Sequence, residues 1–583
     1  MYIFQKIKFN HIIKTIIPKN LPILIIILIS IIRLLQFRFA SDSSYYHFGF
    51  AIQKSHDENL FYNMNNILWK LPHLSDYINI YLKNITLMHI FSSLLPIFNF
   101  ALLSNIVSYF NLKKESNIKD KNYSNYNQYI ALLIILSGVF FYTIASGHTE
   151  QFLLLISFLS TNVIIQHKKN KTTNWRIFNQ KINDFSIFSF NGLLLGIGLC
   201  SKISFLYIYP QIIIFNLIVL LDGKANQLKK KKIIIYLFIN ILFSFLIFSF
   251  YLLQTNEVFD YLKSIFLLKY DNINLQSYII LKNHIYSEKS DFNISIFNSI
   301  KYFFKLSFYP FGMRFPFYLN WYPNLLISIS IIIYSFFKKP LRFLFKNLLI
   351  NYIYIITFFF SYLSYFSSGL HNPRHFFISI VYFILFVYIN NKEVYSKFIN
   401  YIFSASIRIY FLVIGIAFIY MESFGLNLPA KRYFTESNSK TNFSKIKTLF
   451  SSLSNKSNVL NMADSGINLF IPMASHYPSP YWQYGINFSN EKLDLSLIQE
   501  NFQLILLNDD STYKKKHCVY NSSNIYIFKS KSNINRYKEL YNILKDCSTH
   551  LSSIDLIYYE SSLFRKNPKS IRINLAKINF KDK

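Results

Sequence analysis

The sequence RLLQFRFASDSSYYH (residues 33–47) stands where the first long apolar run of the chain meets water. It places two cations, Arg33 and Arg38, and one carboxylate, Asp42, at the mouth of an expected membrane helix. Charges cost several kcal/mol in hydrocarbon, and cations are usually kept off the outer end of a first helix. We therefore expect a functional site at the outer membrane surface, organised around this stretch.

The composition is that of a membrane protein with many spans. Of 583 residues, 52% are hydrophobic and 19% aromatic, and the apolar runs of about 20 residues can each cross a bilayer core. The net charge of +33 lies mostly in short segments between these runs, so it reports topology rather than a nucleic-acid partner. The sequence contains no P-loop or glycine-rich nucleotide motif, which argues against a nucleotide-driven activity.

The charge pattern and the apolar runs predict a polytopic α-helical membrane protein with about 11 transmembrane helices. Arg38 stands where a signal-peptide cleavage site needs a small residue, so we expect an uncleaved anchor with a cytoplasmic N-terminus. Residues 40–84 and 254–321 are predicted to form interfacial helices on the outer leaflet. The expected spans are residues 21–39, 85–110, 129–145, 151–166, two crossings between 182 and 223 that turn near Ser201 and Lys202, 233–253, 323–337, 346–366, 376–390 and 405–421.

An odd number of spans places the C-terminal part of the chain outside the membrane. We expect a transmembrane domain over residues 1–425 and a small extracytoplasmic α/β domain over residues 426–583. The elements predicted in the second domain are strands near 459–466 and 502–510 and helices near 491–501 and 533–547.

The three cysteines do not have the spacing of a metal or redox motif. Cys200 lies within an apolar run, whereas Cys518 and Cys547 lie in the polar C-terminal domain, too far apart for a CxxC motif. An extracytoplasmic location permits a disulfide between these two residues.

The predicted topology gathers ionisable residues from distant parts of the chain at one membrane surface. Cations at such a surface suit the phosphate of a lipid-linked substrate, while a carboxylate takes a proton from an incoming hydroxyl. We predict a site with Asp42 as the catalytic residue. The substrate-binding residues predicted for this site are Arg38, His148, Glu150, Lys202, His371, Arg374 and His375.

Each of these residues also has a purely structural interpretation. Asp42 is suited to cap the N-terminus of a following helix, and Glu150 is suited to the first turn of one. Lys202 can extend its ammonium to the headgroups, and Arg374 can bind lipid phosphate nonspecifically. Arg33 lies deeper in the first span, and we expect it to extend outward and leave it out of the site.

Two motifs resemble a known family of membrane enzymes. The sequence GLLLGIGLCSKISFLYIYP (residues 192–210) resembles a helix pair of bacterial GT-C superfamily glycosyltransferases, the dolichyl-phosphate-mannose protein mannosyltransferase-like and aminoarabinose transferase-like group. NPRHFF (residues 372–377) resembles that group's PR(Y/H) turn, and Asp42 falls where the group keeps its acidic residue. The resemblance covers residues 20–400, with one departure: Ser43 follows Asp42 where many relatives have a second acidic residue.

The resemblance implies an inverting transfer of a sugar from a polyprenyl-phosphate donor to a hydroxyl acceptor, which is a glycan, a lipid or a protein. Asp42 would act as the general base, and Arg374 with Lys202 or Arg38 would neutralise the leaving phosphate. His148, Glu150 and His375 would position the donor or the acceptor. Ser43 leaves a divalent metal an open alternative that the sequence does not indicate, and no cofactor is assigned.

The location implied is the bacterial inner membrane, and two other classes of protein remain open. A lipid-linked polysaccharide polymerase or ligase would use a similar outer site, but with a larger and more arginine-rich loop than residues 254–321. A transporter would place ionisable groups and broken helices at the bilayer midplane, whereas here the ionisable groups lie near the ends of the spans.

Overall fold

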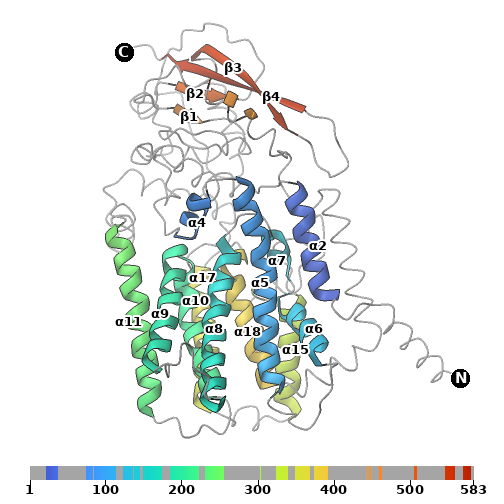
Figure 1. Ribbon diagram of the computed structural model, residues 1–583, viewed down its shortest axis with the longest axis vertical. Coiled ribbons are helices and arrows are strands. Elements are labelled where there is room, and N and C mark those ends of the chain that lie inside the picture. Colours follow the sequence, from blue (N-terminus) through green and yellow to red (C-terminus); the bar gives the residue numbers. More distant parts are fainter. Residues whose placement is uncertain are drawn as a thin grey trace, which may run out of the picture.

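The structure is a bundle of apolar helices with a small β-sheet beyond one end (Figure 1). It is a computed structural model, and its description is confined to part of the chain. The described residues are 21–36, 74–82, 85–112, 123–135, 137–144, 149–173, 184–221, 230–254, 303, 323–338, 348–367, 373–391, 441–442, 444–445, 448, 459–461, 504–507, 545, 547–558 and 569–579.

The helices form where the apolar runs predict them. Those that match expected spans are α2 (Leu21–Gln36), α5 (Ile85–Leu112), α8 (Thr149–Thr173), α9 (Asp184–Ser201), α10 (Phe205–Leu221), α11 (Lys230–Gln254), α15 (Pro323–Lys338), α17 (Leu348–Ser367) and α18 (Phe377–Asn390), the last preceded by the 3₁₀ helix η4 (Pro373–Phe376). The turn predicted near Ser201 and Lys202 is confirmed. The span predicted at 405–421 lies outside the described residues.

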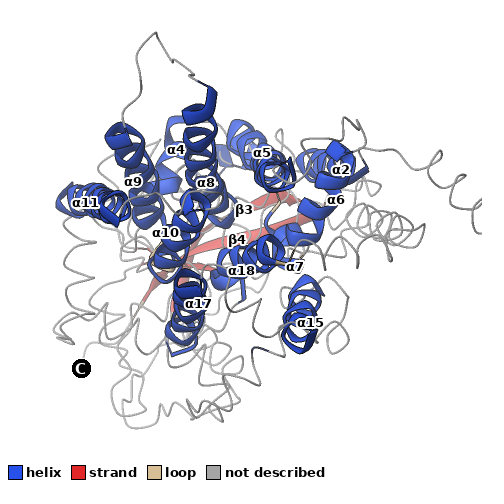
Figure 2. Cartoon of the chain, turned by 90° about the horizontal axis from the view of Figure 1, so that it is seen from below, coloured by secondary structure: helices blue, strands red, loops and turns tan. Residues whose placement is uncertain are grey.

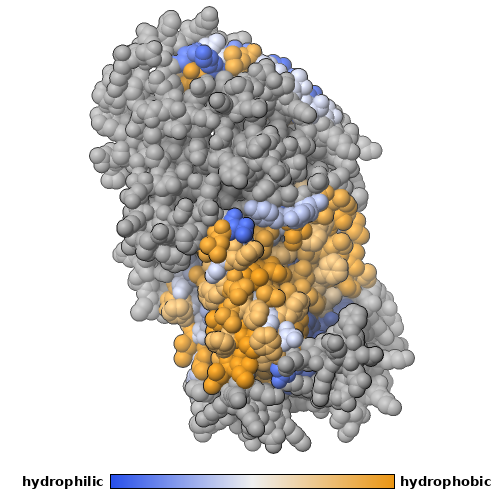
Figure 3. All heavy atoms as spheres, turned by 60° about the vertical axis from the view of Figure 1, so that its left-hand side comes forward, coloured by the Kyte–Doolittle hydropathy of each residue, from blue (hydrophilic) through white to orange (hydrophobic). Residues whose placement is uncertain are grey.

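Three of the described helices are long and apolar enough to cross a membrane by themselves: Leu87–Asn111, Asp184–Ser201 and Ile233–Gln254. The last of these belongs to α11, whose outward face carries exposed residues such as Phe238, Leu246 and Phe250. Figure 3 shows apolar side chains covering this side of the bundle. In water such a large exposed apolar face would favour aggregation, so it is the surface that a bilayer would cover.

Seen along its axis, the bundle has α10 and α18 toward the middle and α11, α15 and α17 at the margin (Figure 2). The residues of α18 are buried almost throughout. Buried polar side chains link these inner helices. Asn216 of α10 donates to Ser160 Oγ of α8 at 2.8 Å, and Ser160 in turn donates to Asn191 of α9 at 3.0 Å. Tyr382 of α18 donates to the Ser157 carbonyl of α8 at 2.6 Å.

Hydrogen bonds between uncharged groups are suited to an apolar interior, because an unpaired polar group there would cost several kcal/mol. These contacts fix the rotation of each helix about its own axis. They thereby fix which residues the helices present at their ends.

Small residues bring α9 and α11 close together. A Cβ added at Gly192 would lie 2.9 Å from the Asn240 carbonyl oxygen, and one at Gly196 would lie 2.9 Å from the Ser244 carbonyl oxygen. Ser244 also donates from its hydroxyl to the Gly192 carbonyl at 2.8 Å. The glycines of the GLLLG sequence are therefore contact points between helices, as is common in membrane bundles.

The prediction of one continuous helix for the third expected span, 129–145, is wrong. This span is two helices, α6 (Tyr123–Ile135) and α7 (Gly138–Thr143), which are interrupted at Ser137. The Ser137 hydroxyl accepts a hydrogen bond from the Phe140 N–H at 3.1 Å, so it caps the start of α7 and allows the chain to change direction. Apolar periodicity does not reveal such a break.

A short amphipathic helix, α4 (Leu74–Leu82), lies between the bundle and the sheet (Figure 1). Leu74 packs with Cys200 and Ile203 at the end of α9, so α4 marks the end of the bundle that faces the sheet. We call this the sheet end. An interfacial helix was predicted within residues 40–84, and α4 is the described part of it, while most of 254–321 lies outside the described residues.

The C-terminal sheet has four strands in the order β1-β2-β4-β3. β1 (Val459–Asn461) and β2 (Leu504–Leu507) pair in parallel and confirm the two predicted strands within their described residues. β4 (Lys569–Ile578) pairs antiparallel with β2 and with β3 (Ser548–Tyr558), and this hairpin was not predicted. Cys547, directly before β3, is disulfide-bonded. Cys518 and the helices predicted at 491–501 and over most of 533–547 lie outside the described residues.

The close packing of α9 on α11 yields a stability prediction. Gly196→Ala should lower the thermal unfolding midpoint of the detergent-solubilised protein, because the new methyl group meets the α11 backbone at 2.9 Å. Alanine is otherwise favoured over glycine inside a helix by about 0.5–1 kcal/mol, so a fall in the midpoint isolates the steric effect. Leu246→Ala, at an exposed position of α11, is the control and should leave the midpoint nearly unchanged; a rise in Gly196→Ala would contradict the packing.

Candidate functional site

The carboxylate of the candidate site comes from the first turn of α8. Glu150 is the second residue of that helix, and its side chain is only 3% exposed. The positive end of a helix dipole favours a carboxylate at this position. A buried charge nevertheless needs direct partners, because loss of hydration is costly.

Lys202 supplies the first cationic partner from the turn between α9 and α10. The Phe205 N–H donates to the Lys202 carbonyl at 2.9 Å, which closes the turn. Gly198 makes room for it, since any Cβ there would overlap the ring of Phe205. The Lys202 ammonium donates to Glu150 Oε1 at 2.5 Å. The glycine-rich sequence before Lys202 therefore shapes the turn that delivers this ammonium to Glu150.

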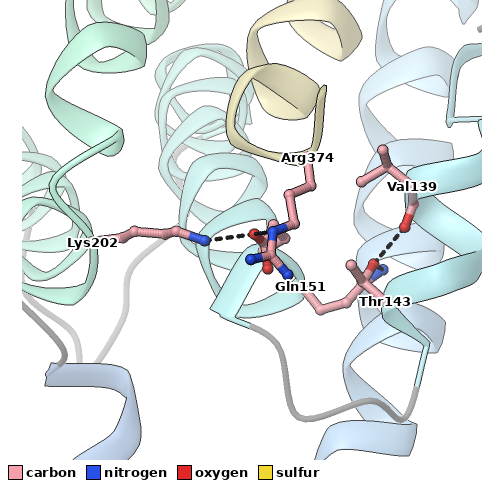
Figure 4. A network of polar contacts seen from close by, with 6 residues as sticks. Val139, Thr143, Gln151, Lys202 and Arg374 are labelled. Atoms are coloured by element: carbon pink, nitrogen blue, oxygen red, sulfur yellow. Dashed lines mark hydrogen bonds and ion pairs between the residues drawn. The ribbon is translucent and has the colours of Figure 1, made fainter. Parts of the chain in front are cut away.

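Arg374 supplies the second cation from η4, the short helix that precedes α18. Its Nε atom lies 3.8 Å from Glu150 Oε1, the same oxygen that Lys202 contacts, and its side chain is 10% exposed. Figure 4 shows Lys202 approaching this point from the left and Arg374 from above. One carboxylate thus lies between two cations, and we call Glu150, Lys202 and Arg374 the ion triad.

The ion triad unites three of the residues that the sequence predicted as substrate-binding. His375 follows Arg374 in η4 and is half-buried. The remaining predicted residues lie outside the described part of the chain: Arg38, Asp42, His148 and His371.

Arg33 does not extend outward as the sequence suggested. It is only 2% exposed, and its Nη1 donates to the Ile144 carbonyl at 2.5 Å, directly after α7. The physical reason for this correction is the break at Ser137, because it places the carbonyl end of the short helix α7 next to α2. The unpaired carbonyls at a helix C-terminus attract a cation.

Sequence reasoning also missed a buried amide network next to Glu150. Gln151 donates from Nε2 to Thr143 Oγ1 at 2.8 Å and to the Phe140 carbonyl at 3.2 Å. Asn99 of α5 donates from Nδ2 to the Gln151 carbonyl and to Gln151 Oε1, both at 2.8 Å. The signal available in the sequence was a polar residue, Asn99, within the long apolar run of α5.

On α4, Asp76 is buried beside Tyr77, near the ends of α5, α8 and α9. Burial, and next the negative charge of Asp76, raise the pKa of Tyr77 above its usual value. The phenol therefore stays neutral and able to donate a hydrogen bond throughout the physiological pH range. The sequence alone did not single out either residue.

The described residues contain no group of three or more His, Cys, Asp or Glu side chains that could hold a metal ion. In the described site, two cations contact one carboxylate oxygen. Such a pair of cations can neutralise a phosphate group.

Comparison with known proteins gives weak structural likenesses. No family model and no curated protein matches the chain. The apo oligosaccharyltransferase of Archaeoglobus fulgidus resembles it with a TM-score of 0.44 at 13% identity, covering 84% of this chain and 69% of the other. The complex of that archaeal enzyme, AglB, with an inhibitory peptide and a dolichol-phosphate gives 0.42 at 11% identity, covering 94% and 75%.

A third structure, of the same enzyme tethered to an acceptor peptide, gives a TM-score of 0.42 at 12% identity and covers 84% of this chain and 68% of the other. The enzyme is a membrane glycosyltransferase of the GT-C superfamily, the group that the sequence motifs resemble. At TM-scores below 0.5, the likeness by itself establishes no shared activity.

The ion triad predicts a large stability effect of a small change. Glu150→Gln removes the carboxylate that contacts both buried cations, and removing one partner of a buried pair costs about 3–5 kcal/mol. The thermal unfolding midpoint should therefore fall clearly. Asp555→Asn is the matched control, because Asp555 pairs with Arg572 at 3.2 Å with both side chains nearly half exposed, and such pairs contribute about 0–1 kcal/mol. Equal midpoints for Glu150→Gln and the unmodified protein would contradict the pairing.

Proposed function

We propose that the chain is a membrane glycosyltransferase that transfers a sugar from a polyprenyl-phosphate donor to a hydroxyl acceptor at the outer membrane surface. The observation that carries the proposal is the ion triad. Its two cations come from turns that are far apart in sequence, and they meet at the end of a bundle with an apolar outer face. A phosphate attached to a lipid needs both features, a cationic pocket and an adjacent bilayer.

In the proposed reaction, the bond between the sugar's anomeric carbon and the phosphate oxygen breaks as the acceptor oxygen bonds to that carbon from the opposite face. The leaving polyprenyl phosphate gains one negative charge. Arg374, with Lys202 or Arg38, neutralises this charge as it develops. Asp42 accepts the proton of the acceptor hydroxyl. His148, Glu150, His371 and His375 position the donor or the acceptor.

Two observations support an outward orientation of the sheet end. Lys168 and Lys169 lie near the far end of α8, and positive residues are enriched on the cytoplasmic side of a membrane. The disulfide of Cys547 belongs to the sheet, and disulfides persist in oxidising compartments outside the cytoplasm. These observations support our proposal that the N-terminus lies in the cytoplasm and the domain at residues 426–583 outside. The bacterial inner membrane is the location that the sequence resemblance implies.

The proposed acceptor is a glycan, a lipid or a protein. Among the archaeal oligosaccharyltransferase structures, one contains a dolichol-phosphate and another a tethered acceptor peptide. A lipid-linked donor and a protein acceptor both fall within the proposal for this chain.

The described interior argues against the transporter alternative. The hydrogen-bonded side chains between the inner helices, such as Asn191, Asn216 and Tyr382, are uncharged. The ion triad instead lies at the bundle end. A transporter is expected to bind its substrate near the midplane between discontinuous helices.

Arg374→Ala tests the proposed phosphate site. The probe is undecaprenyl phosphate, added to the purified protein in lipid nanodiscs. Loss of a charge-assisted contact worth about 1.5–3 kcal/mol should weaken binding by about 10- to 100-fold. The control is Lys168→Ala, which removes a cation that donates to the Val219 carbonyl at 2.7 Å near the other end of α8 and should leave affinity unchanged. Unchanged affinity in Arg374→Ala would refute the assigned role.

Asp42→Asn tests the proposed general base. The donor that accumulates in membranes of a strain lacking this protein is identified by mass spectrometry and supplied to purified protein. Removal of a general base lowers turnover by about 10²- to 10⁴-fold, and donor binding should stay close to that of the unmodified protein. Near-normal turnover in Asp42→Asn would eliminate Asp42 as the base.

A further inference from the structure

The segment that leads into Glu150 is held at both of its ends by buried side chains to which the proposed reaction assigns no role. This segment connects α7, which ends at Thr143, to α8, which begins at Thr149. At its first end, Arg33 of α2 donates to the Ile144 carbonyl at 2.5 Å. A guanidinium at this position satisfies carbonyls that a helix C-terminus leaves without intrahelical partners. The end of α7 is thereby attached to α2.

At the second end, Gln151 joins three helices immediately after Glu150. Its side-chain N–H group donates back to Thr143 and Phe140 of α7, while its oxygens accept from Asn99 of α5. Gln151 and Asn99 are fully buried. Figure 4 shows Gln151 beside the ion contact and Thr143 bonded onward to Val139. Each hydrogen bond restrains the backbone from which the Glu150 side chain projects.

We propose that Arg33 and Gln151 are positioning residues, which hold the start of α8 so that the Glu150 carboxylate reaches Lys202 and Arg374. The consequence for catalysis rests on the proposed function, in which the ion triad binds the donor. The positioning itself is a property of the fold and does not depend on that function. A site residue misplaced by 1 Å costs activity even when the residue itself is unchanged.

Asn162 provides a matched control within the same pair of helices. It is a buried amide of α8 that donates to the Leu102 carbonyl of α5 at 3.2 Å and to the Phe158 carbonyl at 2.9 Å. It lies roughly 17 Å farther along α8 than Gln151, at a rise of 1.5 Å per residue. Its replacement removes a comparable interhelical hydrogen bond, but at a distance from the ion triad.

The experiment measures how fast acetic anhydride modifies the Lys202 ammonium in the full-length protein in nanodiscs, by mass spectrometry of the Lys202 peptide. Lys445 in the C-terminal domain serves as the internal reference. The buried contact with Glu150 occupies the Lys202 ammonium and shields it from the reagent, so Glu150→Gln should raise its acetylation rate severalfold. Arg33→Gln and Gln151→Leu should reproduce at least half of that rise. In Asn162→Leu, the Lys202 acetylation rate should stay within twofold of that of the unmodified protein. This should hold even if its unfolding midpoint falls as far as those of Arg33→Gln and Gln151→Leu.

An unchanged Lys202 rate in both Arg33→Gln and Gln151→Leu would overturn the proposal, as would an equal rise in Asn162→Leu. Should Arg33→Gln fail to fold, Arg33→Lys takes its place, because lysine retains the charge but lacks the reach of the guanidinium. A raised Lys202 acetylation rate in Arg33→Lys supports the positioning role of Arg33, and a rate equal to that of the unmodified protein contradicts it.

Acetylation requires no sugar donor, so its outcome is independent of the proposed function. If that function holds, the variants with the fastest Lys202 acetylation should have the lowest turnover. If the unmodified protein neither binds undecaprenyl phosphate nor turns over donor, the proposed function fails while the acetylation result still decides the positioning role.

Discussion

The contact of Glu150 with Lys202 and Arg374 is the interaction on which the arrangement of the bundle end depends. Each of these side chains is at least 85% buried, and an isolated charge at such a position would lose its hydration without compensation. The first turn of α8, the turn after α9 and the short helix η4 must therefore meet. The two cations of this contact are the groups that an incoming anion could bind.

The packing deeper in the bundle makes this meeting possible. Gly192 and Gly196 allow α9 to lie directly against α11, and Gly198 lets the chain fold back so that Lys202 projects toward α8. Uncharged hydrogen bonds between Asn191, Ser160 and Asn216 hold α8, α9 and α10 in one relative rotation. A small shift in that rotation would move the ends of all three helices.

Much of the bundle and part of the site could be predicted from the sequence. The lengths of the apolar runs and the lysines beside them located most of the described spans. The alternation of basic clusters between the spans predicted that Glu150, Lys202 and Arg374 lie at one membrane surface. Hydropathy could not locate the interruption at Ser137, because a single capping hydroxyl within an apolar run barely alters the average. For the same reason it could not show that Arg33 turns inward to the end of α7.

The hairpin of β3 and β4 was not predicted, although residues 571–575 of β4 alternate regularly between apolar and polar side chains. In β3 the alternation is broken, because the adjacent Ser552 and Ser553 follow the register shift after His550. The role of Gln151 depends on which side chains reach one another across three helices, which spacing along one chain does not encode. Asp42 was predicted from its place after the first span, and it stays a prediction.

The central claim is that the two cations of the ion triad bind the phosphate of a lipid-linked donor. The most direct test is an experimental structure of the protein in nanodiscs with undecaprenyl phosphate. The account predicts density for the phosphate within hydrogen-bonding distance of Lys202 and Arg374, at the end of the bundle that faces the sheet. Density for the phosphate at another surface, with Glu150 still enclosed by both cations, would contradict it.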